Sequence, residues 1–169
     1  GDPDLAAGGF DVVVASLVVF FLPHPDTAVA RWVRLLAPGG RLGLSTFGAQ
    51  SQEWLAMEEA LLGFMPPADP RTVGPASPFA SDAGVEALLV RGGADGVRTT
   101  HRRVGFTFDG FESWLRFSRS GGQRVAWERM DGSDTARILA DSERLFASLA
   151  DAAGRLAVWQ DVRYTVGTA

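Results

Sequence analysis

The 169-residue sequence contains no cysteine. This absence excludes a disulfide framework, a thiolate metal site and a cysteine nucleophile. Long apolar runs are also missing, because the longest one, residues 12–22, is interrupted by Ser16 and falls short of the roughly 18 residues of a membrane-spanning helix. No signal peptide is visible. We therefore expect no membrane partner and a cytoplasmic location.

An excess of basic charge is missing as well. The chain has 16 Lys and Arg against 20 Asp and Glu, and its net charge is −4. A protein that binds the nucleic-acid backbone needs a basic patch, so we expect no nucleic-acid partner. Apolar side chains make up 46% of the residues, which is sufficient for a sizeable core. The length and composition predict a single domain over residues 1–169.

The first fifty residues predict a strand, a helix and a second strand. Residues 10–15 (FDVVVA) are almost entirely apolar, which is typical of a strand covered on both sides in a parallel sheet. Pro25 suits the first position of a helix. Apolar residues then recur with helical spacing at Val29, Trp32, Val33 and Leu36. We expect the helix to end at the turn of residues 37–40 (APGG), before a strand over residues 41–47, which completes a parallel βαβ unit.

Further elements follow from periodicity in the rest of the chain. We expect helices over residues 52–65 and 134–152, a short helix capped by Ser81, a helix opened by a capping box of Asp109 and Glu112, and strands over residues 97–108 and 156–166. The last strand alternates apolar and polar residues, which is typical of an antiparallel strand. Residues 66–80 carry five prolines and no periodicity, which indicates a loop long enough to act as a lid or substrate-binding loop.

The opening segment resembles a known family. Residues 10–48 (FDVVVASLVVFFLPHPDTAVARWVRLLAPGGRLGLSTFG) are similar to the fourth strand, the following helix and the fifth strand of class I S-adenosylmethionine-dependent methyltransferases. The matching residues are Phe10, Asp11, Leu22, Pro23, Pro25, Arg34, Leu36, Pro38, Gly39 and Gly40. The segments FESWLRFSRSGGQRVAWERM and VWQDVRYTVGTA are similar to small-molecule methyltransferases of high-GC bacteria. The resemblance implies an α/β fold, namely the C-terminal half of a Rossmann-like doubly wound methyltransferase sheet whose last strand is antiparallel.

The resemblance also implies a function, S-adenosylmethionine-dependent methyl transfer to a small-molecule acceptor in bacterial small-molecule metabolism. The family has a Gly-rich G-x-G turn that approaches the methionine part of the cofactor, and an acidic residue that holds the ribose hydroxyls. Neither has a counterpart here, since Gly39-Gly40 precedes a strand and Gly92-Gly93 follows a helix. We therefore expect the substrate-side part of a truncated or split methyltransferase, inactive by itself.

Four residues are expected near the cofactor. By resemblance, Asp2 occupies the place of an acidic residue that bonds the adenine amino group, although a solvated terminal Asp is the simpler interpretation. Ala15, Ser16 and Leu17 lie at the carboxyl end of the first strand, where open α/β sheets bind their ligands. Their main-chain groups would face the methionine part of the cofactor; the alternative is an ordinary strand end.

Aromatic residues suggest a substrate pocket. Phe20, Phe21, Trp114 and Phe117 could wall such a pocket, and aromatic faces suit a sulfonium cation, although core packing is the commoner fate of these side chains. No catalytic residue stands out. His24 could act as a base, but it occupies the position of a helix cap, usually Asp in the family. His24 and His101 are the only histidines, and we expect no metal.

A second hypothesis is a non-catalytic interaction module. Without the family's first strand, the strand of residues 10–15 would have one bare apolar edge, which favours pairing with another chain. A homo-oligomer or a separate N-terminal half would provide that partner. A Rossmann oxidoreductase shares the same βα order, but the chain lacks the dinucleotide fingerprint as well.

Overall fold

The computed structural model of the chain describes residues 5–67, 69 and 74–169, which divide into two compact units. The first unit comprises residues 5–49, 69, 74–103 and 161–169, and the second comprises residues 50–67 and 104–160. The single domain over residues 1–169 stays a prediction.

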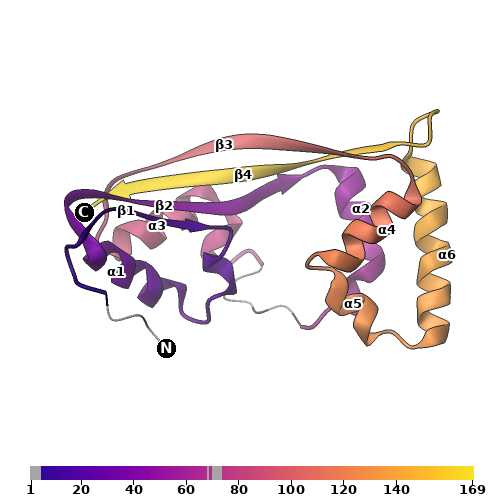
Figure 1. Cartoon of the computed structure of the whole chain (residues 1–169), viewed down its shortest axis with the longest axis horizontal. Coiled ribbons are helices and arrows are strands. Elements are labelled where there is room, and N and C mark those ends of the chain that lie inside the picture. The colour runs from indigo at the N-terminus through magenta and orange to yellow at the C-terminus, as the bar shows by residue number, and fades with distance from the viewer. Residues whose placement is uncertain (1–4, 68, 70–73) are drawn as a thin grey trace. The chain divides into compact units, whose positions relative to one another are not determined.

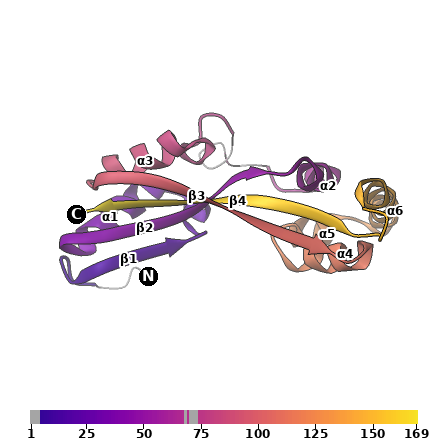
Figure 2. The same ribbon diagram turned by 90° about the horizontal axis from the view of Figure 1, so that it is seen from above.

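Four strands form one sheet in the order β1-β2-β4-β3. Their bounds are Phe10–Ser16 for β1, Leu36–Gln50 for β2, Asp95–Phe108 for β3 and Leu156–Thr168 for β4. Figure 2 shows the strands of the first unit side by side in this order. β1 pairs with β2 in parallel, as predicted. β4 runs antiparallel to β2, because Ala169, directly after β4, exchanges backbone hydrogen bonds with Gly39 and Gly40 near the start of β2.

The strand order is that of a doubly wound sheet with one additional strand, β4, inserted between β2 and β3. In the doubly wound order 3-2-1-4-5-6, the last three strands are neighbours. Here the antiparallel β4 lies between β2 and β3, although it is the last strand in the sequence.

Two helices cover one side of the sheet in the first unit. They are α1 (Pro25–Leu35) and α3 (Asp82–Arg91), and both lie below the strands in Figure 1. Their buried residues form one core with apolar residues of β1 and β2: Ala15, Val29, Val33, Leu42, Leu44, Val85, Leu88 and Leu89. Short 3-10 turns flank the two helices, at Val19–Phe21 (η1) and Pro78–Ala80 (η2).

The other face of β1 is exposed. Val12 is 58% exposed and Val14 is 69% exposed, whereas Ala15 on the opposite face is buried. The sequence predicts a strand covered on both sides. Within residues 5–67, 69 and 74–169, however, α1 and α3 supply cover on one side only.

The APGG segment departs from its prediction. β2 begins at Leu36, directly after α1, so residues 37–40 lie inside the strand instead of forming a turn before it. The pairing is irregular there: β1 advances from Phe10 to Val12 while β2 advances from Leu36 to Arg41. A bulge of this kind inserts extra residues into one strand of a pair. Gly40 fits it because a Cβ there would lie 2.9 Å from the carbonyl oxygen of Ala37.

Capping explains where several helices begin. The Ser81 hydroxyl accepts a hydrogen bond from the Gly84 backbone N–H at 3.1 Å, so the predicted cap of α3 is confirmed. α1 starts with Pro25 at its first position, and the His24 side chain makes no capping bond. The predicted capping box at Asp109 is wrong, because the N-cap of α4 is Gly110, with no side-chain bond.

The second unit is built mainly of helices around a core of its own. Its helices are α2 (Gln52–Leu62), α4 (Phe111–Ser120), α5 (Arg124–Arg129) and α6 (Gly132–Leu149), drawn in Figure 1 in colours from magenta to orange. The core includes Met57, Leu61, Phe108, Trp114, Trp127, Ile138, Phe146 and Leu156. The predicted helices 52–65 and 134–152 correspond to α2 and α6, while α5 was not predicted.

Candidate active site at the carboxyl ends of two parallel strands

The backbone is strained directly after β1. Leu17 has a φ of 48°, the left-handed region that non-glycine residues rarely adopt. Its N–H donates to the carbonyl oxygen of Ser45 at 3.2 Å and to the Ser45 hydroxyl at 3.0 Å. Because such conformations cost free energy and cluster at functional sites, the strain marks this strand end as a candidate site.

Two serines link the end of β1 to its neighbour β2. The hydroxyls of Ser16 and Ser45 are 3.1 Å apart, and the two residues are register partners across β1 and β2. Ser45 is only 5% exposed. Sequence reasoning missed Ser45, although its place near the end of a strand parallel to β1 was a usable signal.

The residues predicted to bind the cofactor differ in how exposed they are. Ala15 is 6% exposed with its side chain in the core, so only its main chain remains for a ligand. Ser16 is exposed, and Leu17 is half-buried. Asp2 lies outside the described residues. The prediction that these residues bind the cofactor stays a prediction.

Four phenylalanines gather beside this strand end. The ring centre of Phe20 lies 4.7 Å from that of Phe21, 5.3 Å from that of Phe47 and 6.2 Å from that of Phe79. Phe21 is 76% exposed and Phe47 is 46% exposed. Large apolar side chains with this much exposed surface are available to a ligand. We name Phe20, Phe21, Phe47 and Phe79 the phenylalanine cluster.

The other two predicted pocket residues belong to the second unit. Trp114 is 3% exposed and stacks on Phe111 with ring centres 5.5 Å apart, which agrees with the core-packing alternative. Phe117 is 38% exposed, and its ring lies 5.7 Å from that of Trp54. Phe20 and Phe21 thus lie in the first unit, whereas Trp114 and Phe117 lie in the second.

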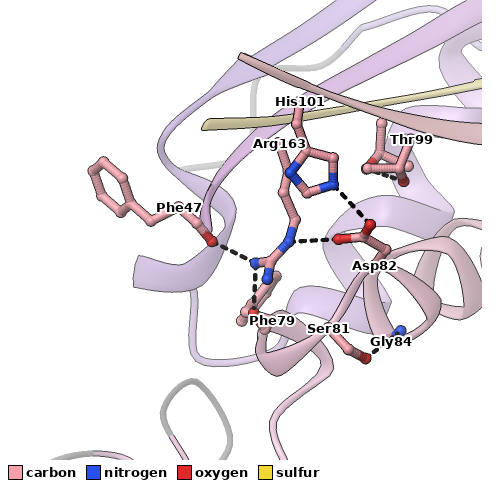
Figure 3. A network of polar contacts seen from close by, with 9 residues as sticks. Phe47, Phe79, Ser81, Asp82, Gly84, Thr99, His101 and Arg163 are labelled. Atoms are coloured by element: carbon pink, nitrogen blue, oxygen red, sulfur yellow. Dashed lines mark hydrogen bonds and ion pairs between the residues drawn. The ribbon is translucent and has the colours of Figure 1, made fainter. Parts of the chain in front are cut away.

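A partly buried arginine on β4 ties three segments of the first unit together (Figure 3). The Arg163 side chain is 11% exposed. Its Nε donates to Asp82 at 2.7 Å, and its Nη1 donates to the carbonyl oxygen of Phe79 at 3.0 Å and to that of Phe47. Arg163 therefore holds the main chain at two members of the phenylalanine cluster.

Asp82 has a second partner on β3. The Nε2 of His101 lies 2.7 Å from the other carboxylate oxygen of Asp82. The hydrogen bond with His101, assisted by the one from Arg163, holds the pKa of Asp82 below its ordinary value of 3.8. We therefore assign His101 a structural role, the hydrogen bond to Asp82.

His24 lies elsewhere in the first unit. It lines an open hollow of about 640 Å³ together with Leu22, Arg31 and Trp32. The lining of this hollow includes neither Leu17 nor any member of the phenylalanine cluster. We therefore assign the hollow no part in the candidate active site.

The described residues offer neither a metal-binding cluster nor a membrane-spanning helix. Among residues 5–67, 69 and 74–169, no group of three or more His, Asp or Glu residues is placed to hold a metal ion. In the same residues, no helix is both long and apolar enough to cross a membrane. The predicted lid, residues 66–80, lies partly outside the described residues.

Sequence comparisons relate the chain to methyltransferases. The sequence model of a methyltransferase domain family matches residues 2–44, which contain β1, α1 and the strained Leu17. Nocamycin O-methyltransferase of Saccharothrix syringae is 30% identical over 178 residues, which cover 98% of the chain. The chain spans 63% of the length of that relative.

Solved structures share the fold. The YcgJ protein of Bacillus subtilis matches with a TM-score of 0.52 and 13% identity, covering 98% of the chain and 66% of that protein. A protein of Bacillus halodurans C-125 provisionally named a methyltransferase matches with a TM-score of 0.50 and 12% identity, covering 98% and 66%. At these identities the likeness shows the fold alone.

The resemblance to class I S-adenosylmethionine-dependent methyltransferases is thereby confirmed. So is the predicted fold class, a Rossmann-like α/β sheet with an antiparallel last strand. S-adenosylmethionine is the cofactor of this class.

Proposed function

We propose that the chain is the substrate-side part of an S-adenosylmethionine-dependent methyltransferase that acts on a small-molecule acceptor. The observation that carries the proposal is the strained Leu17, at the carboxyl end of a parallel strand within the segment that matches the methyltransferase domain family. The similarity to Nocamycin O-methyltransferase supports a small-molecule acceptor.

The described residues fit one end of the cofactor. The exposed faces of Phe21 and Phe47 suit a sulfonium cation, and the main chain of residues 15–17 suits the methionine part. When bound, S-adenosylmethionine supplies an activated methyl group. We assign Ser45 the role of fixing the backbone of Leu17, and the phenylalanine cluster the roles of positioning the acceptor and excluding water. We identify no general base.

Affinity for the cofactor should be weak. Among the described residues and in the sequence as a whole, no G-x-G turn follows a strand and opens a helix, so we assign no residue the role of holding the ribose. Asp2, proposed for the adenine, lies outside the described residues.

The test is an NMR titration of the chain with S-adenosylhomocysteine. We expect weak binding that shifts the amide signals of residues 15–17, and no such shifts with adenosine, which lacks the amino-acid part. A response that does not include these amides would contradict the proposal. Calorimetry with S-adenosylmethionine should give no tight heat signal, and micromolar binding would overturn the expectation of weak affinity.

A second candidate function is an interaction module, favoured by the edge strand β1. Its neighbour on one side is β2, and β1 ends the strand order. Phe10, Val12 and Val14 are exposed along it. An apolar edge strand favours pairing with another strand, from a second copy or a separate N-terminal half.

A further inference from the structure

The second unit contains a small aromatic cavity. Its lining includes the rings of Trp54, Phe108, Trp114 and Phe117 and the polar side chains of Glu58 and Gln123. The volume is about 10 Å³, which is the room that one water-sized group needs. We name this space the aromatic cavity.

Two buried polar atoms of residues that line this cavity lack partners. The indole Nε1 of Trp54 and the amide Oε1 of Gln123 are both shielded from solvent, and neither has a hydrogen-bond partner among the described residues. Buried polar groups are nearly always paired, so each unpaired atom calls for an explanation. An indole N–H can only donate, and an amide oxygen can only accept.

A carboxylate fixes which way the Gln123 amide points. The Nε2 of Gln123 donates to Oε1 of Glu58 at 3.2 Å, and the Nε2 of Gln50 donates to Oε2 of Glu58 at 3.4 Å. With its nitrogen facing Glu58, the Gln123 amide is left with its oxygen as an acceptor without a partner among the described residues. Both oxygens of Glu58 are thereby engaged.

We infer that the aromatic cavity binds the hydroxyl group of a planar ring, such as a phenol, on the acceptor substrate. A hydroxyl group can both accept from an indole N–H and donate to an amide oxygen, so it matches the two kinds of unpaired atom. A protonated amine cannot accept, and an amide group exceeds the volume. The partly exposed ring of Phe117 favours an aromatic carrier for this hydroxyl.

The inference rests on the proposed function only in treating the bound ligand as a substrate. It also assigns a role to Phe117. The ring of Phe117 is 38% exposed and lies 5.5 Å from that of Phe108. It therefore lines the cavity and also reaches the surface, where the rest of a ring-shaped ligand would lie.

The test is an NMR titration of the whole chain, with ¹⁵N-labelled indoles, against phenol. The chain has five tryptophans, and the Trp54 signal is assigned by its absence from Trp54→Phe. Phenol should shift this signal at concentrations about tenfold or more below those of anisole, which cannot donate, and of toluene, which lacks both functions. Equal responses to phenol and toluene would overturn the inference. So would the absence of any response to phenol, since the cavity would then hold a water molecule only.

Two variants test whether the phenol response depends on the Gln123 oxygen. Gln123→Met keeps the side-chain length but removes the acceptor, so phenol should bind roughly tenfold more weakly and lose its advantage over anisole. Trp32→Phe, in the first unit, should leave the response unchanged. If Gln123→Met fails to fold, the comparison of the three probes on the unaltered chain still decides.

The readout does not involve the cofactor. A phenol response without a response of residues 15–17 to S-adenosylhomocysteine would leave the hydroxyl site standing and count against the proposed function. The opposite result would overturn the hydroxyl site alone.

Discussion

The guanidinium of Arg163, on β4, lies 2.7 Å from the carboxylate of Asp82 in the first turn of α3. The two residues are far apart in the sequence, and their contact anchors the start of α3 to the sheet. The same guanidinium binds two main-chain carbonyls, so its removal deletes three hydrogen bonds.

We therefore predict that Arg163→Met destabilises the chain. Loss of a charge-assisted hydrogen bond and of two bonds to carbonyls should lower the free energy of unfolding by about 1–3 kcal/mol, measured by urea denaturation. The matched control is Arg103→Met, which removes an arginine that is 58% exposed and pairs with Asp161. Its effect should be smaller, and equal effects would contradict the special role of Arg163.

Asp82 should contribute to the acid sensitivity of folding. Its pKa is lower in the folded chain than its ordinary value of 3.8, so the folded state is favoured while Asp82 is ionised. That contribution is present above about pH 4 and is lost as the pH falls through the lowered pKa. Asp82→Asn should therefore flatten the dependence of the urea midpoint on pH below about 4. Parallel curves for the variant and the unaltered chain would refute this.

Val14→Lys tests the edge of β1. If the exposed face and edge of this strand cause self-association, a lysine there should shift the chain toward the monomer in size-exclusion chromatography with light scattering. Val90→Lys is the control, because Val90 is an exposed valine on α3. An unaltered chain that is already a uniform monomer would count against self-association.

Alanine variants of Trp114 and Phe21 should differ in stability, because Trp114 is buried in a core and Phe21 is exposed. Trp114→Ala should cost about 3–5 kcal/mol of unfolding free energy, since this ring is buried in the core of the second unit. Phe21→Ala should change stability by no more than about 0.5 kcal/mol, because the ring is 76% exposed. Urea denaturation of both variants measures the two losses of unfolding free energy. Comparable losses would contradict the assignment of Phe21 to an open surface.

Leu17→Gly should relieve backbone strain. Both Leu17→Gly and Leu17→Ala lose the half-buried leucine side chain, but glycine adopts a positive φ without a steric penalty and alanine keeps the strain. Leu17→Gly should therefore be more stable than Leu17→Ala by about 1 kcal/mol. If the two variants have equal stability, the conformation of Leu17 stores no strain.

Much of the fold was predictable from the sequence because its signals are local. The helical spacing of Val29 and Val33, and the alternation along residues 156–162, each reflect a single element with one buried face. The order of strand, helix and strand over residues 10–47 predicted the parallel pairing of β1 and β2.

The rest was not predictable because it depends on contacts across the chain. The bond between Arg163 and Asp82 joins residues with no shared motif. The division into two units is equally hidden, because β3 and β4 are continuous strands that each contribute residues to both units. Residue type alone also could not decide between core and pocket for Trp114.

The bulge at residues 37–40 also sets the alignment of the candidate site. Beyond it, β1 and β2 stay in step from Val12 opposite Arg41 to Ser16 opposite Ser45. Side chains alternate along a strand, so deleting one residue from the bulge would turn Ser45 to the other face of the sheet. Leu17 would then lose the hydroxyl that holds its backbone. The Pro-Gly-Gly segment thus acts as a spacer whose length is as constrained as the identity of any residue at the site.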